Sequence, residues 1–293
     1  MKHTLLTAVT LISLIIVSTV IGGVSGPVAI DWHNGGHLCV LYRPGVAQVV
    51  DETRRVRIAT IPVPTGVQPV EIVSARLQER EYVFVSGFLG RTGAIYQFDA
   101  KGKLLNRYET PEQAASFDID PAKGSSRRLL YVASPVNNAI YAINLDQKGA
   151  FPRTVTYIKQ AEAIGPVIFD QGRNRLIVGD TAQGGGLYEV DCATGAYRQT
   201  IPALPGRPIS FAFDATFKTL YIAEASTGRI QVLKLDGSGS FRQAETIPTD
   251  LRNLFAVSLG PNDTLFLADS YRGLYQLSLK TRKAAAFVVL TSP

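Results

Sequence analysis

Short apolar runs separated by turns recur along this chain at a nearly constant interval. The clearest copy is an alternating apolar run around a tyrosine, and Tyr96, Tyr141, Tyr188 and Tyr275 follow one another after 45, 47 and 87 residues. The last interval corresponds to two repeats. A period of about 40 to 50 residues built of short strands is typical of a β-propeller, in which each repeat forms one blade.

Each repeat contains four strand-like runs in the same order. The first run of a repeat often ends on an aspartate, and the second is apolar, as at residues 129–133. The tyrosine run is the third, and the fourth alternates polar residues with apolar ones, as at 154–158. Six such sets begin near residues 27, 69, 114, 164, 208 and 253. We therefore predict an all-β protein, a six-bladed β-propeller over residues 27–293 with four antiparallel strands per blade. Because each set carries its own four strands, we expect the first blade to pack against the last without a shared strand.

The first 26 residues differ in kind from the repeats. Lys2 and His3 precede an uncharged apolar run over residues 5–20, and a glycine-rich stretch over 22–26 follows it. This order predicts a secretory signal peptide over residues 1–26, cleaved between Gly22 and Gly26. If it stays uncleaved, the run is long enough for an N-terminal membrane anchor. In both cases the propeller is expected to be exported, and therefore periplasmic or secreted, with a membrane contact only if the segment is retained.

Composition and charge narrow the partner classes. A chain of 293 residues with 46% hydrophobic and 18% charged residues suits one well-buried domain. The formal net charge is +6, but the densest basic groups, such as Arg54 and Arg55, lie where charged residues protect strand edges from pairing. An exported chain without a basic stripe interleaved with aromatic residues is not expected to bind nucleic acid. We expect a monomer.

The two cysteines belong to different repeats. Cys39 lies in the first strand set and Cys192 in the fourth. These sets lie opposite each other in a six-membered ring, so a disulfide between them is not expected. We expect Cys39 to be buried and Cys192 to lie in an exposed turn.

Several strands carry motifs of a known group of propellers. The runs at 130–133, 220–223 and 265–268, together with 267–275, resemble the gluconolactonase, strictosidine-synthase-like and NHL-repeat group of six-bladed propellers, and the resemblance covers nearly all of 27–290. For the lactonase branch, it implies an axial divalent cation, usually calcium, held partly by a glutamate just before a Gly-Pro pair. Here Ser25 and Ile164 precede the two Gly-Pro-Val motifs, so we expect no axial calcium and no cofactor.

Three acids fall at equivalent points of consecutive repeats. Asp180, Glu224 and Asp269 are 44 and 45 residues apart, each at the end of a second strand. An acid at such a point is expected to accept hydrogen bonds from the backbone of the following turn, with metal binding by the trio as the alternative. The innermost strands themselves are expected to be apolar, which leaves Glu162 as the only carboxylate placed on the inner loops.

Ligand binding is predicted at the mouth of the central axis, where the loops that lead into the innermost strands converge. The predicted mouth carries two arginines, Arg207 and Arg252, and one acid, Glu162. This excess of positive charge favours an anionic or carbonyl-bearing ligand. The sequence indicates a non-catalytic exported propeller that binds a small molecule, glycan or protein on its axial face; the alternative is a lactonase-like hydrolase or related propeller enzyme with a non-standard site. No catalytic residue is identified. The predicted ligand-binding residues are Gln68, Gln113, Glu162, Arg207, Arg252 and Asn253.

Overall fold

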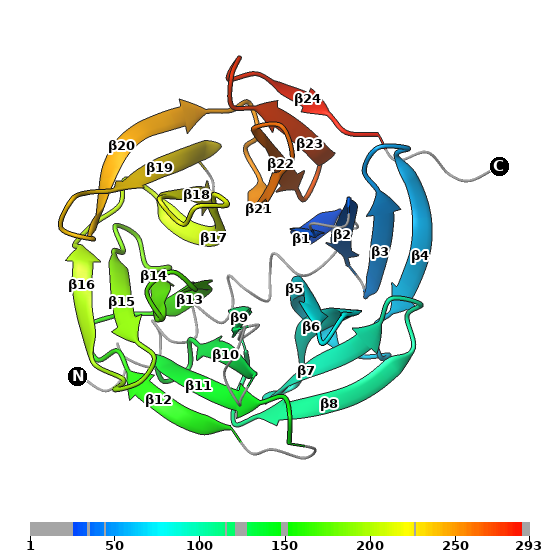
Figure 1. Cartoon of the computed structure of the whole chain (residues 1–293), viewed down its shortest axis with the longest axis horizontal. Coiled ribbons are helices and arrows are strands. Elements are labelled where there is room, and N and C mark those ends of the chain that lie inside the picture. The colour runs from blue at the N-terminus through cyan, green and yellow to red at the C-terminus, as the bar shows by residue number, and fades with distance from the viewer. Residues whose placement is uncertain are drawn as a thin grey trace, which may run out of the picture.

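The computed structural model describes residues 26–33, 36–43, 45–114, 116–120, 128–147, 152–225 and 227–288. These residues form six four-stranded antiparallel sheets arranged as blades around one axis (Figure 1). The six-bladed all-β prediction is therefore confirmed. The predicted signal peptide or anchor lies outside the described residues except for Gly26.

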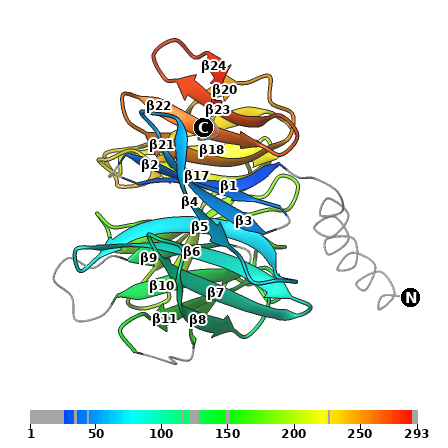
Figure 2. The ribbon, with the colours of Figure 1, turned by 90° about the vertical axis from the view of Figure 1, so that its right-hand side faces the viewer.

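The strands of each blade follow one another in chain order from the axis outward, and Figure 2 shows the ring edge-on. We name the blades A to F along the chain. Blade A contains β1 (Pro27–His33), β2 (His37–Tyr42), β3 (Val46–Asp51) and β4 (Val56–Pro62); B contains β5 (Gln68–Leu77), β6 (Arg80–Leu89), β7 (Thr92–Asp99) and β8 (Leu104–Thr110); C contains β9 (Ser116–Asp120), β10 (Leu129–Ser134), β11 (Ala139–Asn144) and β12 (Arg153–Tyr157); D contains β13 (Ile164–Asp170), β14 (Arg175–Asp180), β15 (Leu187–Asp191) and β16 (Tyr197–Ile201); E contains β17 (Arg207–Phe213), β18 (Thr219–Ala225), β19 (Arg229–Leu235) and β20 (Phe241–Pro248); F contains β21 (Leu254–Gly260), β22 (Thr264–Asp269), β23 (Gly273–Ser278) and β24 (Ala284–Ala286).

The observed blades begin within two residues of the predicted starts. No helix occurs among the described residues, and none of them forms a segment that could cross a membrane as a helix. The local alternation of apolar and polar residues was therefore sufficient to locate nearly every strand.

The core is divided into six clusters of buried apolar side chains, one at each interface between neighbouring blades. The cluster that closes the ring joins Ile30 and Val40 of blade A to Phe266 of blade F and to Phe287. The Arg55 guanidinium lies 5.0 Å from the centre of the Phe287 ring and adds a cation–π contact at this interface. The ring thus closes by packing of two complete blades, as expected from the order of the strand sets.

Proline marks the beginning of four innermost strands. Pro27, Pro69, Pro166 and Pro208 lie where the pairing of β1, β5, β13 and β17 with the next strand shifts register. A proline has no N–H to donate, so it suits a bulge where a ladder hydrogen bond is already interrupted. The Gly-Pro pairs at residues 26–27 and 165–166 therefore have a role in strand geometry.

The cysteines agree only partly with the prediction. Both are free and lie in blades on opposite sides of the ring (Figure 1). Cys192, however, is buried in the cluster between blades C and D, so its predicted exposure was wrong. The turn after β15 folds inward there, and the thiol lies against Tyr131 of blade C.

Candidate functional site

All six predicted ligand-binding residues lie on one face of the ring. We call the face at which the innermost strands begin the top face, and the opposite face the bottom face. Gln68 and Arg207 are the first residues of β5 and β17, and the other four lie in the loops just before β9, β13 and β21. The loops that connect the second strand of each blade to its third strand also lie on the top face, because the strands of each blade are antiparallel.

The six side chains differ in exposure and in partners. Gln68, Glu162, Arg252 and Asn253 are exposed, whereas Gln113 and Arg207 are partly buried. Gln113 Nε2 donates to the Gly90 carbonyl at 2.9 Å, and Arg207 Nε donates to the Thr181 carbonyl at 2.7 Å. Within the described residues, no hydrogen bond or ion pair joins two of the six, and their joint action on a ligand stays a prediction.

Buried carboxylates hold the loops of the top face in place. Asp180 accepts the backbone N–H groups of Glu162 and Ala163 at 3.0 and 3.1 Å. Asp269 accepts those of Asn253 at 3.2 Å and Tyr271 at 2.9 Å.

Glu224 acts in the same way in blade E. It accepts the Gly206 N–H at 2.9 Å and the Thr227 hydroxyl at 3.1 Å. The expected bonds from the backbone of the following turn are present at Asp180, which accepts the Ala182 N–H at 3.1 Å, and at Asp269, whereas Glu224 accepts a side-chain hydroxyl of that turn instead. The sequence did not predict that the same acids also fix the loop that enters their own blade.

Three apolar side chains project from turns of this face. Leu89 is 62% exposed, Val136 54% and Tyr271 67%, and they lie in the turns after β6, β10 and β22. The top face therefore combines exposed apolar tips with exposed polar and charged groups on loops whose backbone is fixed.

A polar channel follows the axis between the innermost strands. It encloses a cavity of about 190 Å³ lined by residues of all six blades. Since one water molecule takes about 30 Å³ of liquid, the cavity has room for roughly six water molecules or a small polar group. Its polar lining comprises Asp31, Glu71, Ser116, Asp118, Ser210 and Ser258.

These polar side chains connect several pairs of neighbouring blades. An innermost strand pairs with a neighbour along one edge only, so backbone N–H groups along its other edge need acceptors. Asp31 of blade A accepts the Ser74 N–H of blade B at 2.7 Å, and Asp118 of blade C accepts the Phe169 N–H of blade D at 2.7 Å. Ser258 of blade F accepts the Trp32 N–H of blade A at 2.9 Å.

The channel carboxyls hold their protons up to unusually high pH. Burial raises the pKa of Asp31 to about 6, that of Asp118 to about 7 and that of Glu71 to about 8. The negative charge of Asp31 adds to the rise at the other two. Near neutral pH the three groups are therefore a mixture of acids and carboxylates.

The expectation of apolar innermost strands was wrong, and Glu162 is not the only carboxylate on the loops that lead into them, since Glu112 and Asp250 also lie there. Asp31, Glu71 and Asp118 lie on the innermost strands β1, β5 and β9. A signal existed in the sequence, because each acid interrupts an apolar run next to an isoleucine, in Ile30-Asp31, Glu71-Ile72 and Asp118-Ile119. A charged residue within a buried strand indicates a polar partner or a channel.

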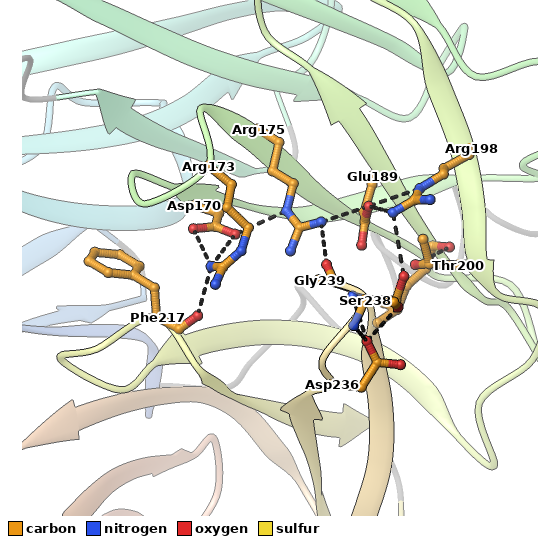
Figure 3. Close-up of polar contacts among 12 residues, drawn as sticks. Asp170, Arg173, Arg175, Glu189, Arg198, Thr200, Phe217, Asp236, Ser238 and Gly239 are labelled. Carbon is orange, nitrogen blue, oxygen red and sulfur yellow. Dashed lines mark hydrogen bonds and ion pairs between the residues drawn. The ribbon is translucent and has the colours of Figure 1, made fainter.

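A second buried polar cluster lies at the bottom face between blades D and E (Figure 3). Arg175 Nε lies 3.0 Å from Asp170 Oδ2, and Arg175 Nη1 lies 2.8 Å from Glu189 Oε2. The same Nη1 donates to the Gly239 carbonyl of blade E at 3.0 Å. Arg198 pairs with Glu189 from the solvent side at 2.7 Å. We call this set, completed by Arg173, the D–E ion network.

Side chains that could ligate a metal do not cluster within the part of the chain that the structure describes. No group of three His, Cys, Asp or Glu residues within it could hold a metal ion. The channel carboxyls instead use their oxygens for backbone and hydroxyl donors.

Known structures share the fold at low sequence identity. The sequence matches no known protein family and no curated protein. A chain in the crystal structure of a nidogen/laminin complex is similar over 85% of this chain and 92% of its own length, with 15% identity and a TM-score of 0.67. A chain in the crystal structure of a mitotic checkpoint complex is similar over 83% and 72%, with 14% identity and a TM-score of 0.58. These similarities establish the propeller fold and no more.

Proposed function

We propose that this chain is an exported, non-catalytic propeller that binds a small molecule, glycan or protein on its top face, with protein as the best supported class. The observation that carries the proposal is the rigid presentation of exposed side chains. Glu162 and Asn253 have backbone N–H groups bound by buried carboxylates, and Arg207 follows a glycine bound in the same way. A loop that is already ordered loses little entropy on binding, so its side chains contribute more to affinity.

The apolar tips support a protein ligand. Leu89, Val136 and Tyr271 are each more than half exposed on the same face as the polar residues. Protein interfaces combine aromatic and apolar contacts with a polar surround, and tyrosine and arginine are enriched in them. A chain of similar fold occurs in the crystal structure of a nidogen/laminin complex, which agrees with a protein-binding use of this architecture.

Selection of a random peptide library on the purified protein tests the proposal. We expect the selected peptides to lose at least about tenfold in affinity for an Arg252→Glu, Asn253→Ala variant, because both side chains are exposed at the proposed site. A matched variant on the bottom face, Arg80→Glu with Lys101→Glu, should bind them unchanged, since both residues are exposed at the far end of blade B. Peptides that map to the bottom face or the outer strands would contradict the proposal.

A lactonase-like hydrolase of the gluconolactonase, strictosidine-synthase-like and NHL-repeat group is the second candidate. It is supported by Glu71 and Asp118, whose raised pKa values at a cavity suit acid–base catalysis. Against it, the Asp118 carboxylate is already engaged by the backbone of the next blade. Hydrolysis of a lactone, with or without calcium, that is lost in Glu71→Gln would place this candidate first.

The proposal that the protein is exported rests on its N-terminal segment alone. The uncharged apolar run over residues 5–20 and the glycine-rich stretch after it support a cleaved signal peptide. N-terminal sequencing of the protein recovered from periplasm or medium is expected to find cleavage between Gly22 and Gly26. Recovery of the uncleaved chain with the membrane fraction would favour an anchor.

A further inference from the structure

An arginine-rich patch lies on the top face of blades E and F. Arg207 and Arg229 begin β17 and β19, Arg252 lies in the loop before β21, and Tyr271 and Arg272 form the turn after β22. We call these five residues the E–F patch. Tyr271 has the largest exposed fraction of the exposed apolar and aromatic side chains, at 67%.

A chain of hydrogen bonds connects the segments that carry the patch. Glu224 accepts from Gly206, beside Arg207, and from the Thr227 hydroxyl, which in turn accepts the Arg229 N–H at 3.3 Å. The Thr249 N–H donates to the Gly228 carbonyl at 2.8 Å, which links the turn before Arg229 to the loop that carries Arg252.

The last link of the chain is made by a patch residue. Arg272 Nη1 donates to the Asp250 carbonyl at 2.9 Å, and this bond joins the turn after β22 to the loop before β21. The five patch residues therefore lie on one continuous, hydrogen-bonded surface whose loops are ordered before any partner arrives.

The water-exposed charge of this surface is predominantly positive. Glu224 and Asp269 are fully buried and engaged by backbone donors, so they offer no oxygen to a partner. Asp250 is the one exposed acid in the described segments that carry the patch, against four arginines.

Two of the four arginines have unengaged side chains. Among the described residues, the guanidinium groups of Arg229 and Arg252 make no hydrogen bond or ion pair, whereas Arg207 and Arg272 each donate to a backbone carbonyl. Some exposed arginines elsewhere on the ring, among them Arg76, Arg107 and Arg282, instead pair with a nearby glutamate. Unpaired arginines on fixed loops attract a negatively charged partner and can grip its carboxylates with two parallel hydrogen bonds.

We propose that the E–F patch is the docking surface for an acidic segment of a protein partner. The inference rests on the proposed function of the top face and specifies the chemistry of the partner. Four arginines and a tyrosine, with no lysine among them, match the composition of energetically dominant residues in protein interfaces.

The probe for the test is a fluorescein-labelled octaglutamate peptide, with octaglutamine as the uncharged control, measured by fluorescence anisotropy on the full chain. We expect binding of octaglutamate only, weakened when ionic strength rises from about 0.05 to about 0.3 M. Arg252→Glu with Arg272→Glu should reduce the affinity by about tenfold or more. Tyr271→Ser should reduce the affinity for an octaglutamate peptide that carries one central leucine by about threefold or more.

Three outcomes would overturn the proposal. One is equal loss of binding in Arg80→Glu, Lys101→Glu on the bottom face, since that result indicates attraction by net charge alone. Another is absence of salt-sensitive octaglutamate binding by the wild-type protein. The third is stronger patch-dependent binding to phosphatidylserine vesicles than to the peptide, which indicates a lipid partner. If library-selected peptides still require Arg252 and Asn253 while octaglutamate fails, the top-face function survives and only the acidic chemistry is wrong.

Discussion

The axial channel and the D–E ion network bury carboxylates in two different ways. In the channel, Asp31 and Asp118 face backbone N–H groups, and no arginine or lysine lines the cavity. In the network, Asp170 and Glu189 share the guanidinium of Arg175 (Figure 3). Burial raises the pKa of Asp31 and of Asp118 in the channel, because neutral donors compensate only part of the loss of water.

The position within the blade explains the difference. The innermost strands have an unpaired edge, so N–H groups are available there as partners for acids and hydroxyls. Glu189 lies on β15, which pairs with β14 on one side and β16 on the other, so side chains must supply its donors. Asp170 is the last residue of the innermost strand β13 at the bottom face, where Arg173 and Arg175 follow it closely enough to reach its carboxylate. Polar burial inside the channel therefore uses backbone and hydroxyl donors, whereas burial at these two positions uses a charge pair.

Removal of Arg175 should produce the largest effect. Arg175→Ala leaves Asp170 and Glu189 buried without their shared cation, and we expect a loss of about 3–5 kcal/mol in the free energy of unfolding. Urea denaturation followed by circular dichroism measures it. Arg198→Ala is the matched control, because the Arg198 side chain also binds Glu189 but is 61% exposed; its loss should be about 0–1 kcal/mol. Similar losses in the two variants would show that the network is not sealed from water.

The second largest effect is expected in the pH dependence of stability, which should come from the acids of the axial channel. Folding raises the pKa of Asp31, Asp118 and Glu71, so the folded state binds more protons than the unfolded one between their ordinary values near 4 and about 8. Their contribution is therefore fully present below about pH 4 and is lost as the pH rises to about 8, by an amount on the order of a few kcal/mol. Urea midpoints measured across this range should fall.

The source of that slope is tested by neutral replacements. Glu71→Gln with Asp118→Asn should flatten the decline, since neither new side chain titrates and both keep an oxygen acceptor. Glu162→Gln on an exposed loop is the control and should keep the slope of the wild type. A decline that persists unchanged in the double variant would assign the pH dependence to groups other than Glu71 and Asp118.

The sequence predicted the blades more completely than the channel. Blade number and strand positions follow from local alternation, and the acids at the ends of second strands follow from spacing. The direction in which Glu71 and Ser210 point depends on register shifts just before them, at Pro69 and Pro208. Each shift reverses the face on which later residues lie, so alternation could not be continued through it. The E–F patch likewise depends on contacts between loops distant in sequence.

The smallest effect is expected within the channel, at Ser258, where a hydroxyl stands in place of a carboxylate. The Ser258 hydroxyl of blade F accepts the Trp32 N–H in the same way that the Asp31 carboxyl accepts the Ser74 N–H, but the hydroxyl carries no charge. Ser258→Ala should therefore cost about 1 kcal/mol at every pH between about 5 and 8, because it removes one neutral acceptor and no titrating group. Ser238→Ala, in an exposed turn, should change stability by less than about 0.5 kcal/mol. A loss of more than about 2 kcal/mol would mean that water cannot reach the freed N–H and that the channel is dry at blade F, whereas no loss would mean that channel water replaces the hydroxyl fully.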